Sequence, residues 1–161
     1  MDVPDSMFDL EDLDATTASY HEAGHVLMAH LLGGRVVGAS IEPDEEDLMG
    51  QTAIEWAGLD PVERSRRSAM VALAGPVTEA WWRGEATALD ALTSWRADWQ
   101  EVERALRIVP AGEREQTLRG WVADVRSELL NDVAWECVCR VADMLEAHGT
   151  LDETLVEDAL A

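Results

Sequence analysis

Apolar residues recur every three or four positions over most of the chain, a spacing that predicts amphipathic helices. The first such stretch begins at Asp14 or Thr16, two residue types suited to an N-cap, and ends at Gly33-Gly34. The residues before it, 1–13, are acidic and lack this spacing, so we expect them to form a solvated, flexible arm.

Two short segments after this helix have the composition of strands. The first covers residues 35–41 and is closed by Pro43, and the second covers residues 51–56 and follows Gly50. An acidic loop, residues 44–47, lies between them. We therefore expect a β-hairpin, or neighbouring strands with a longer connection.

Helical spacing then returns. A helix is expected from Val62 to Gly75-Pro76, because proline suits the first turn of a new helix better than the interior of an old one. A further helix is expected over residues 93–109, stopped by the next proline.

One apolar helical stripe runs through residues 113–147, with room for a break, and Thr150 with Glu153 forms the capping-box pattern of a last short helix. The pattern as a whole predicts an α+β fold that is mainly helical, with a small two- to three-stranded sheet and a helical C-terminal half.

Length and charge narrow the classes of function. The 161 residues suit one domain, which we place at residues 14–161. The formal net charge is -21, from 33 acidic and 12 basic residues. Nucleic acids and anionic membranes are poor partners for such a surface. The chain contains no lysine, which excludes a nucleotide-binding P-loop.

The N-terminal residues lack the basic and apolar regions of a signal peptide, and no apolar run is long enough to span a membrane. We therefore expect a cytoplasmic protein without a membrane partner. Cys137 and Cys139 are expected to be reduced, as in a reducing compartment.

The pattern HExxH spans residues 21–25, inside the first expected helix. Residues four apart share one face of a helix, so His21 and His25 can bind the same cation, while Glu22 can reach a water on it. Zinc lowers the pKa of that water from about 15.7 to about 7, and Glu22 would take the proton. Both histidines are expected on a semi-buried face of the helix, where unpaired imidazoles would be costly. We therefore favour metal binding over the alternative that they are unbound surface histidines.

A catalytic zinc ion needs a third protein ligand, which must come from another part of the chain. Asp98 is our choice, because it lies on the apolar stripe of the helix expected over 93–109, where a carboxylate calls for a cation. Glu79 and Asp90 are rivals for this place. Glu79 is also a candidate to accept a hydrogen bond from a ligand imidazole and so fix its tautomer.

A known family shows several of these motifs in the same order. The matching segments are residues 20–25 with 31–32, 41–43, 73–79 with 84–85, 97–100 and 149–152. With them, the chain resembles the peptidase domain of the FtsH-type, ATP-dependent zinc metalloproteases, from about residue 15 to the C-terminus.

The resemblance implies a zincin-like metallopeptidase domain. In it, His21, His25 and Asp98 would bind Zn²⁺, and Glu22 would be the catalytic base. It also implies a hydrolase that cuts peptide bonds in peptides or unfolded segments.

The resemblance also implies a substrate strand, for which the candidates are Gln51, Thr52, Ala53 and Ile54. This strand would pair with an extended peptide by β-augmentation. Without an ATP-binding loop, hydrolysis by this chain would be ATP-independent. The expected partner is a peptide or an unfolded protein; a separate unfoldase and a homo-oligomer are further possible partners.

Two other functions remain open. The chain is alternatively a catalytically silent zincin-like module that binds a protein partner through its acidic surface or the Trp81-Trp82 pair. A third hypothesis is hydrolysis of a non-peptide amide. An intact Glu22 favours an enzyme, because a silent scaffold has no chemical need for it.

Overall fold

The computed structural model describes residues 6–43, 49–86 and 89–161, and only the backbone of 6–14, 43, 49, 50 and 90. The elements run in the order α1 (Ser6–Leu31), β1 (Arg35–Pro43), β2 (Met49–Glu55), α2 (Pro61–Trp82), α3 (Arg96–Leu106), α4 (Arg114–Leu129), α5 (Asp132–His148), β3 (Thr150–Asp152) and α6 (Glu153–Leu160), with short 3-10 turns at Leu89–Ser94 and Ala111–Glu113. The predicted mainly helical α+β class is confirmed.

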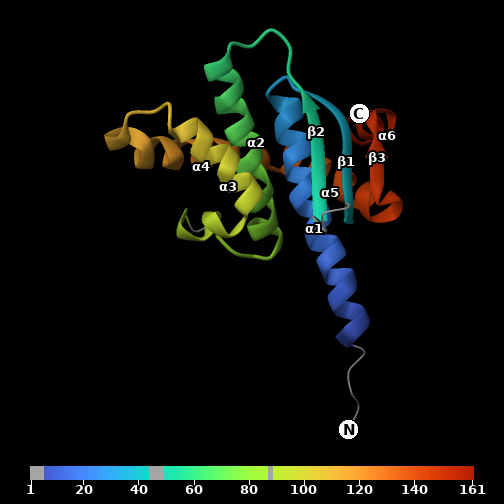
Figure 1. Cartoon of the computed structure of the whole chain (residues 1–161). Helices are drawn as coiled ribbons and strands as arrows, with labels where there is room; N and C mark the ends of the chain where they lie inside the picture. The colour runs from blue at the N-terminus through green and yellow to red at the C-terminus, as the bar shows by residue number, and fades with distance from the viewer. Residues whose placement is uncertain (1–5, 44–48, 87–88) are drawn as a thin grey trace.

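Helix α1 lies at the centre of the molecule and packs against α2 on one side and against the sheet and α5 on others (Figure 1). Helices α3 and α4 pack on α2, and α6 covers the far end of the sheet. Within the described residues, no helix is both long enough and apolar enough to cross a membrane. The predicted acidic loop, residues 44–47, lies outside the described residues.

The sheet has the strand order β2-β1-β3, and both pairings are antiparallel. The predicted pairing of the first two strands is confirmed, with Ala39 opposite Thr52. Strand β2 is therefore an edge strand, and its outer edge is open to pairing with another chain.

The predicted capping box at Thr150 is wrong. Thr150 belongs to β3, and α6 is capped by Asp152, whose side chain accepts a hydrogen bond from the Leu155 N–H. The physical reason is that Leu151 is buried between the sheet and the helices, which holds its neighbours in a strand beside β1.

The expected start of the first helix, at Asp14 or Thr16, is also wrong, because α1 begins at Ser6. Acidic residues favour the positive end of the helix dipole, and nothing after Pro4 breaks a helix. The predicted flexible arm thus includes helical backbone from Ser6 onward, and residues 1–5 lie outside the described residues.

Helix α2 runs straight through Pro76, so the prediction of two helices meeting at Gly75-Pro76 is wrong. An interior proline removes one backbone hydrogen bond and costs about 3 kcal/mol. Residues 69–80 are all buried among α1, α3 and α4, so tertiary packing offsets that cost. The helices predicted over 93–109 and 113–147 are present, the second one broken between α4 and α5.

The two central helices touch at glycines. A Cβ atom on Gly24 of α1 would overlap Thr78 Oγ1 and lie 2.5 Å from the Ala74 carbonyl oxygen of α2. A Cβ atom on Gly75 of α2 would lie 2.5 Å from His25 Nε2. Only glycine allows the helix backbones to approach this closely at both positions.

We expect Gly24→Ala to lower the free energy of unfolding by about 1–3 kcal/mol, the usual cost of overpacking a core. Denaturant unfolding of the purified variant measures it.

Gly120→Ala is the matched control, since Gly120 lies in α4 with no atom within 4 Å of an added Cβ. It should instead raise stability by about 0.5–1 kcal/mol, because alanine favours helix more than glycine does. Equal stability of the two variants would disprove the close contact at Gly24.

Candidate metal centre

Two imidazoles of α1 point toward the same place. His21 and His25 are one helical turn apart, and their ring centroids lie 4.8 Å from each other at an interplanar angle of 81°. Both side chains are largely buried where α1 crosses α2. The helix therefore does what the spacing of the motif predicts, and presents both rings on one face.

Asp98 approaches the same place from the first turn of α3. Its Oδ2 atom lies 2.8 Å from His21 Nε2, and its Oδ1 atom lies 3.3 Å from His25 Nε2. One ligand atom from each of the three residues lies within 4.8 Å of the others. The structure thus brings Asp98 to two histidines of α1, the first of which lies 77 positions before it in the sequence.

The second nitrogen of each ring also has a partner. His25 Nδ1 donates a hydrogen bond of 2.6 Å to the Val71 carbonyl oxygen of α2, and its other nitrogen, Nε2, faces Asp98. His21 Nδ1 lies 3.8 Å from Glu79 Oε2, a charge contact rather than a hydrogen bond. Such partners fix the tautomer and orientation of a metal-binding histidine.

Glu79 is itself held in place. Its Oε2 atom accepts a hydrogen bond of 2.8 Å from Trp95 Nε1, and its Oε1 atom lies 3.5 Å from Arg83. Glu79 thus lies beside His21 but outside the group of three that converges. Its rival Asp90 has a side chain outside the described residues, so that alternative stays a prediction.

The group suits a zinc ion by its chemistry and by its size. Two imidazole nitrogens and one carboxylate form a common donor set of catalytic zinc sites. Bonds of about 2.0–2.1 Å in a tetrahedron place neighbouring donor atoms about 3.3–3.4 Å apart. The observed separations of 2.8 and 3.3 Å come close to this spacing. The group can therefore hold a metal ion with modest adjustment.

The electrostatics of the group favour a cation. Burial lowers the pKa of His21, but the hydrogen bond to Asp98 and the nearby Glu79 carboxylate raise it to about 10. Burial likewise lowers the pKa of His25, but the charge of Asp98 raises it above its ordinary value. The negative potential that stabilises these protons also attracts a divalent ion.

Asp98 shows the reciprocal effect. Burial raises its pKa, but the positive charge of His25 and the hydrogen bonds from both imidazoles lower it well below its ordinary value. The carboxylate is therefore ionised over the whole neutral range, the state in which it can bind a metal.

Glu22 lies beside this group and is also buried. Its Oε2 atom accepts a hydrogen bond of 2.6 Å from Thr52 Oγ1 of β2. Glu22, His25 and Asp98 are among the residues that line a cleft of about 530 Å³. Of the predicted substrate strand, Gln51, Thr52 and Ile54 line the same cleft, whereas Ala53 does not.

A second hollow, of about 280 Å³, opens beside His21 and Glu79. Glu22 lines both this hollow and the larger cleft. The candidate metal-binding group, His21, His25 and Asp98, is therefore bordered by two hollows that share Glu22.

Several features of the site are not evident from the sequence. The roles of the Val71 carbonyl and of Trp95 depend on how helices cross, which no local pattern reveals. Thr52 is predicted only as part of a substrate strand and not as the hydrogen-bond donor to Glu22. Gly75, against the imidazoles, is the one position whose residue type offers a signal, since glycine within a helix indicates close packing.

No protein-family model matches this chain, and no curated protein matches its sequence. Function is therefore inferred from the residues and the geometry of this site.

The three-residue group predicts graded losses of zinc affinity. Asp98→Asn should weaken zinc binding more than 100-fold, because it replaces a charged ligand. Glu79→Gln should weaken it about 10- to 100-fold, the usual effect of a residue that supports a ligand. Competition titration against a chromophoric chelator measures both.

Glu103→Gln is the matched control, since Glu103 is an exposed carboxylate of the same helix as Asp98. It should leave zinc affinity unchanged. Full affinity in the Asp98 variant would rule out Asp98 as a ligand.

Proposed function

We propose that the chain is a zinc-dependent, zincin-like endopeptidase that hydrolyses peptide bonds in peptides or unfolded segments without ATP. One observation carries the proposal: His21, His25 and Asp98 converge on one point beside a cleft, with Glu22 beside them. The resemblance of the motifs to FtsH-type peptidase domains supports the same activity.

Zinc held by His21, His25 and Asp98 would supply Lewis-acid chemistry that makes water nucleophilic at neutral pH. Glu22 is the general base of the proposal: its carboxylate takes the proton of the attacking water and passes it to the leaving amine nitrogen. Because Thr52 holds Oε2 in place, the Oε1 atom is the one that we assign to proton transfer. Burial of Glu22 keeps bulk water from competing for that proton.

The shape of the site favours a substrate peptide that extends on both sides of the bond that is cut. An extended peptide can lie in the larger cleft beside the open edge of β2 and continue into the hollow beside His21. Edge-strand pairing would hold it through main-chain hydrogen bonds, with little regard to sequence. Such binding requires an extended segment, which is why we propose peptides and unfolded segments as substrates.

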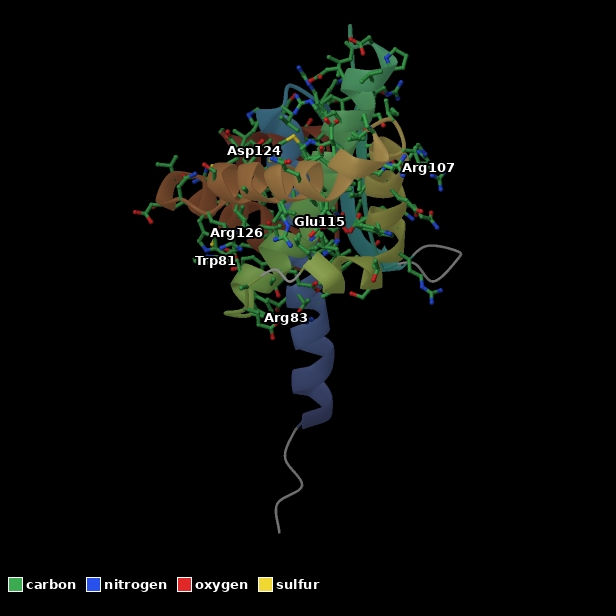
Figure 2. The ribbon with its side chains drawn as sticks, turned by 90° about the vertical axis from the view of Figure 1, so that its left-hand side faces the viewer. Trp81, Arg83, Arg107, Glu115, Asp124 and Arg126 are labelled. Atoms are coloured by element: carbon green, nitrogen blue, oxygen red, sulfur yellow. The ribbon has the colours of Figure 1, made fainter. Side chains whose placement is uncertain are left out.

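The alternative function, a silent binding module, has one observation in its favour. Trp81 is 47% exposed near the end of α2, and Arg126 of α4 lies over its ring at 6.0 Å (Figure 2). Its neighbour Trp82 instead stacks on Tyr20 with centroids 5.1 Å apart, inside the helix packing. One exposed tryptophan is a small surface, and it does not account for Glu22, so we favour the enzyme.

Two substitutions in α1 test the proposal. Glu22→Gln should retain zinc but lose at least 100-fold in the cleavage of casein, because the general base is lost. His25→Ala should lose both zinc and cleavage. Elemental analysis and gel-based proteolysis measure the two properties.

His30→Ala is the matched control, since His30 is an exposed histidine near the end of α1 and away from the cleft. It should retain both properties. Wild-type protein that binds zinc but cuts neither casein nor a broad peptide library would instead support the binding module.

A further inference from the structure

The larger cleft continues well beyond the metal-binding group. On α2, Arg64, Ser68 and Val71 line it, at spacings of four and three residues that keep them on one helix face. Ile54 of β2 and Trp56, which directly follows β2, also line it. A segment bound here in extended form runs from the metal-binding group toward Arg64.

Arg64 is the one arginine among the described residues that line this cleft. Its neighbour in the sequence, Glu63, is already engaged by Arg66 at 2.6 Å and Arg67 at 2.9 Å. Within the described part of the chain, Arg64 itself forms no ion pair within 4.0 Å. Its guanidinium is therefore available to a ligand.

An acidic residue, Glu101 of α3, also lines the cleft, but it pairs with Arg104 at 2.9 Å. Two other carboxylates that line it, Asp98 and Glu22, belong to the metal-binding group and its base. Arg64 thus provides a local positive charge in a cleft of a chain whose net charge is -21. The rest of such a surface repels anions, so an acidic substrate group is best accepted beside this side chain.

The distance from Arg64 to the metal-binding group fixes a register. Val71, whose carbonyl oxygen binds His25, follows Arg64 by seven residues, or two helical turns. Seven residues of helix rise about 10.5 Å, at about 1.5 Å each. An extended peptide covers the same length in about three residues, at about 3.3 Å each.

We propose that Arg64 binds a carboxylate of the substrate about three residues from the bond that is cut, and so gives the enzyme a preference for acidic peptides. Planar guanidinium and carboxylate groups form paired hydrogen bonds, which position the peptide as well as attract it. The inference rests on the proposed peptidase function and specifies the substrates of that site.

The test uses the zinc-loaded full chain and a series of alanine-rich decapeptides. Each peptide carries a glutamate, a glutamine or a lysine at one position, and this position is moved along the series. We expect glutamate to raise kcat/KM over glutamine by about twofold to fivefold at one position, the range of an exposed charge pair. The ratio should fall to about one in Arg64→Gln. In Arg64→Glu, lysine should become the preferred residue at that position.

Arg107→Glu is the matched control, because Arg107 is exposed, lies outside the cleft and changes the net charge equally. It should keep the wild-type preference. Peptides with a free or an amidated C-terminus distinguish the source of the carboxylate. A glutamate preference that is kept in the amidated peptides assigns Arg64 to an acidic side chain. Slower cleavage of the amidated peptides, without a glutamate preference, assigns it to the terminal carboxylate.

Binding of the same peptides to zinc-loaded Glu22→Gln protein, measured by calorimetry, gives a second readout that needs no turnover. Cleavage of all peptides at equal rates would overturn this inference alone. A chain that neither cuts nor binds any peptide of the series would overturn it together with the proposed function.

Discussion

The close crossing of α1 and α2 is the contact on which the rest of the site depends. Gly24 and Gly75 remove the side chains that would hold the two helices apart. Only at this distance can the Val71 carbonyl oxygen of α2 accept the hydrogen bond from His25 Nδ1. The same crossing places Glu79 of α2 beside His21. A helix pair thus sets the orientation of both imidazoles.

Electrostatics and packing act in the same direction around this crossing. Three carboxylates, those of Glu22, Glu79 and Asp98, lie around two imidazoles in a region from which most water is excluded. Buried charges are costly unless they are paired, so the arrangement is stable only with protons or a cation among them. Away from this crossing, Arg64 is the one arginine among the described residues that line the cleft.

Local patterns in the sequence predict the mainly helical α+β class, the first two strands and the helix that bears the metal-binding motif. The motif depends only on the spacing of residues along one helix. His21 and His25 can therefore be identified as candidate ligands from the sequence, without knowledge of the fold. Asp98 is chosen as a ligand because it lies on an apolar stripe. The local sequence does not distinguish it from Glu79 as the third ligand. Only the packing of α3 on α2 makes that distinction. At Pro76 the local sequence leads to a wrong prediction. Proline prefers the first turn of a helix, but burial of the surrounding residues keeps α2 continuous through it.

The most direct test of this account is X-ray absorption at the zinc edge of the purified chain. The account predicts two imidazole nitrogens and one carboxylate oxygen from the protein, at about 2.0–2.1 Å, with solvent in a fourth position. The nitrogen signal should weaken in His25→Ala. Sulfur donors at about 2.3 Å, which only a cysteine such as Cys137 or Cys139 would supply, or a shell of oxygens alone, would contradict it.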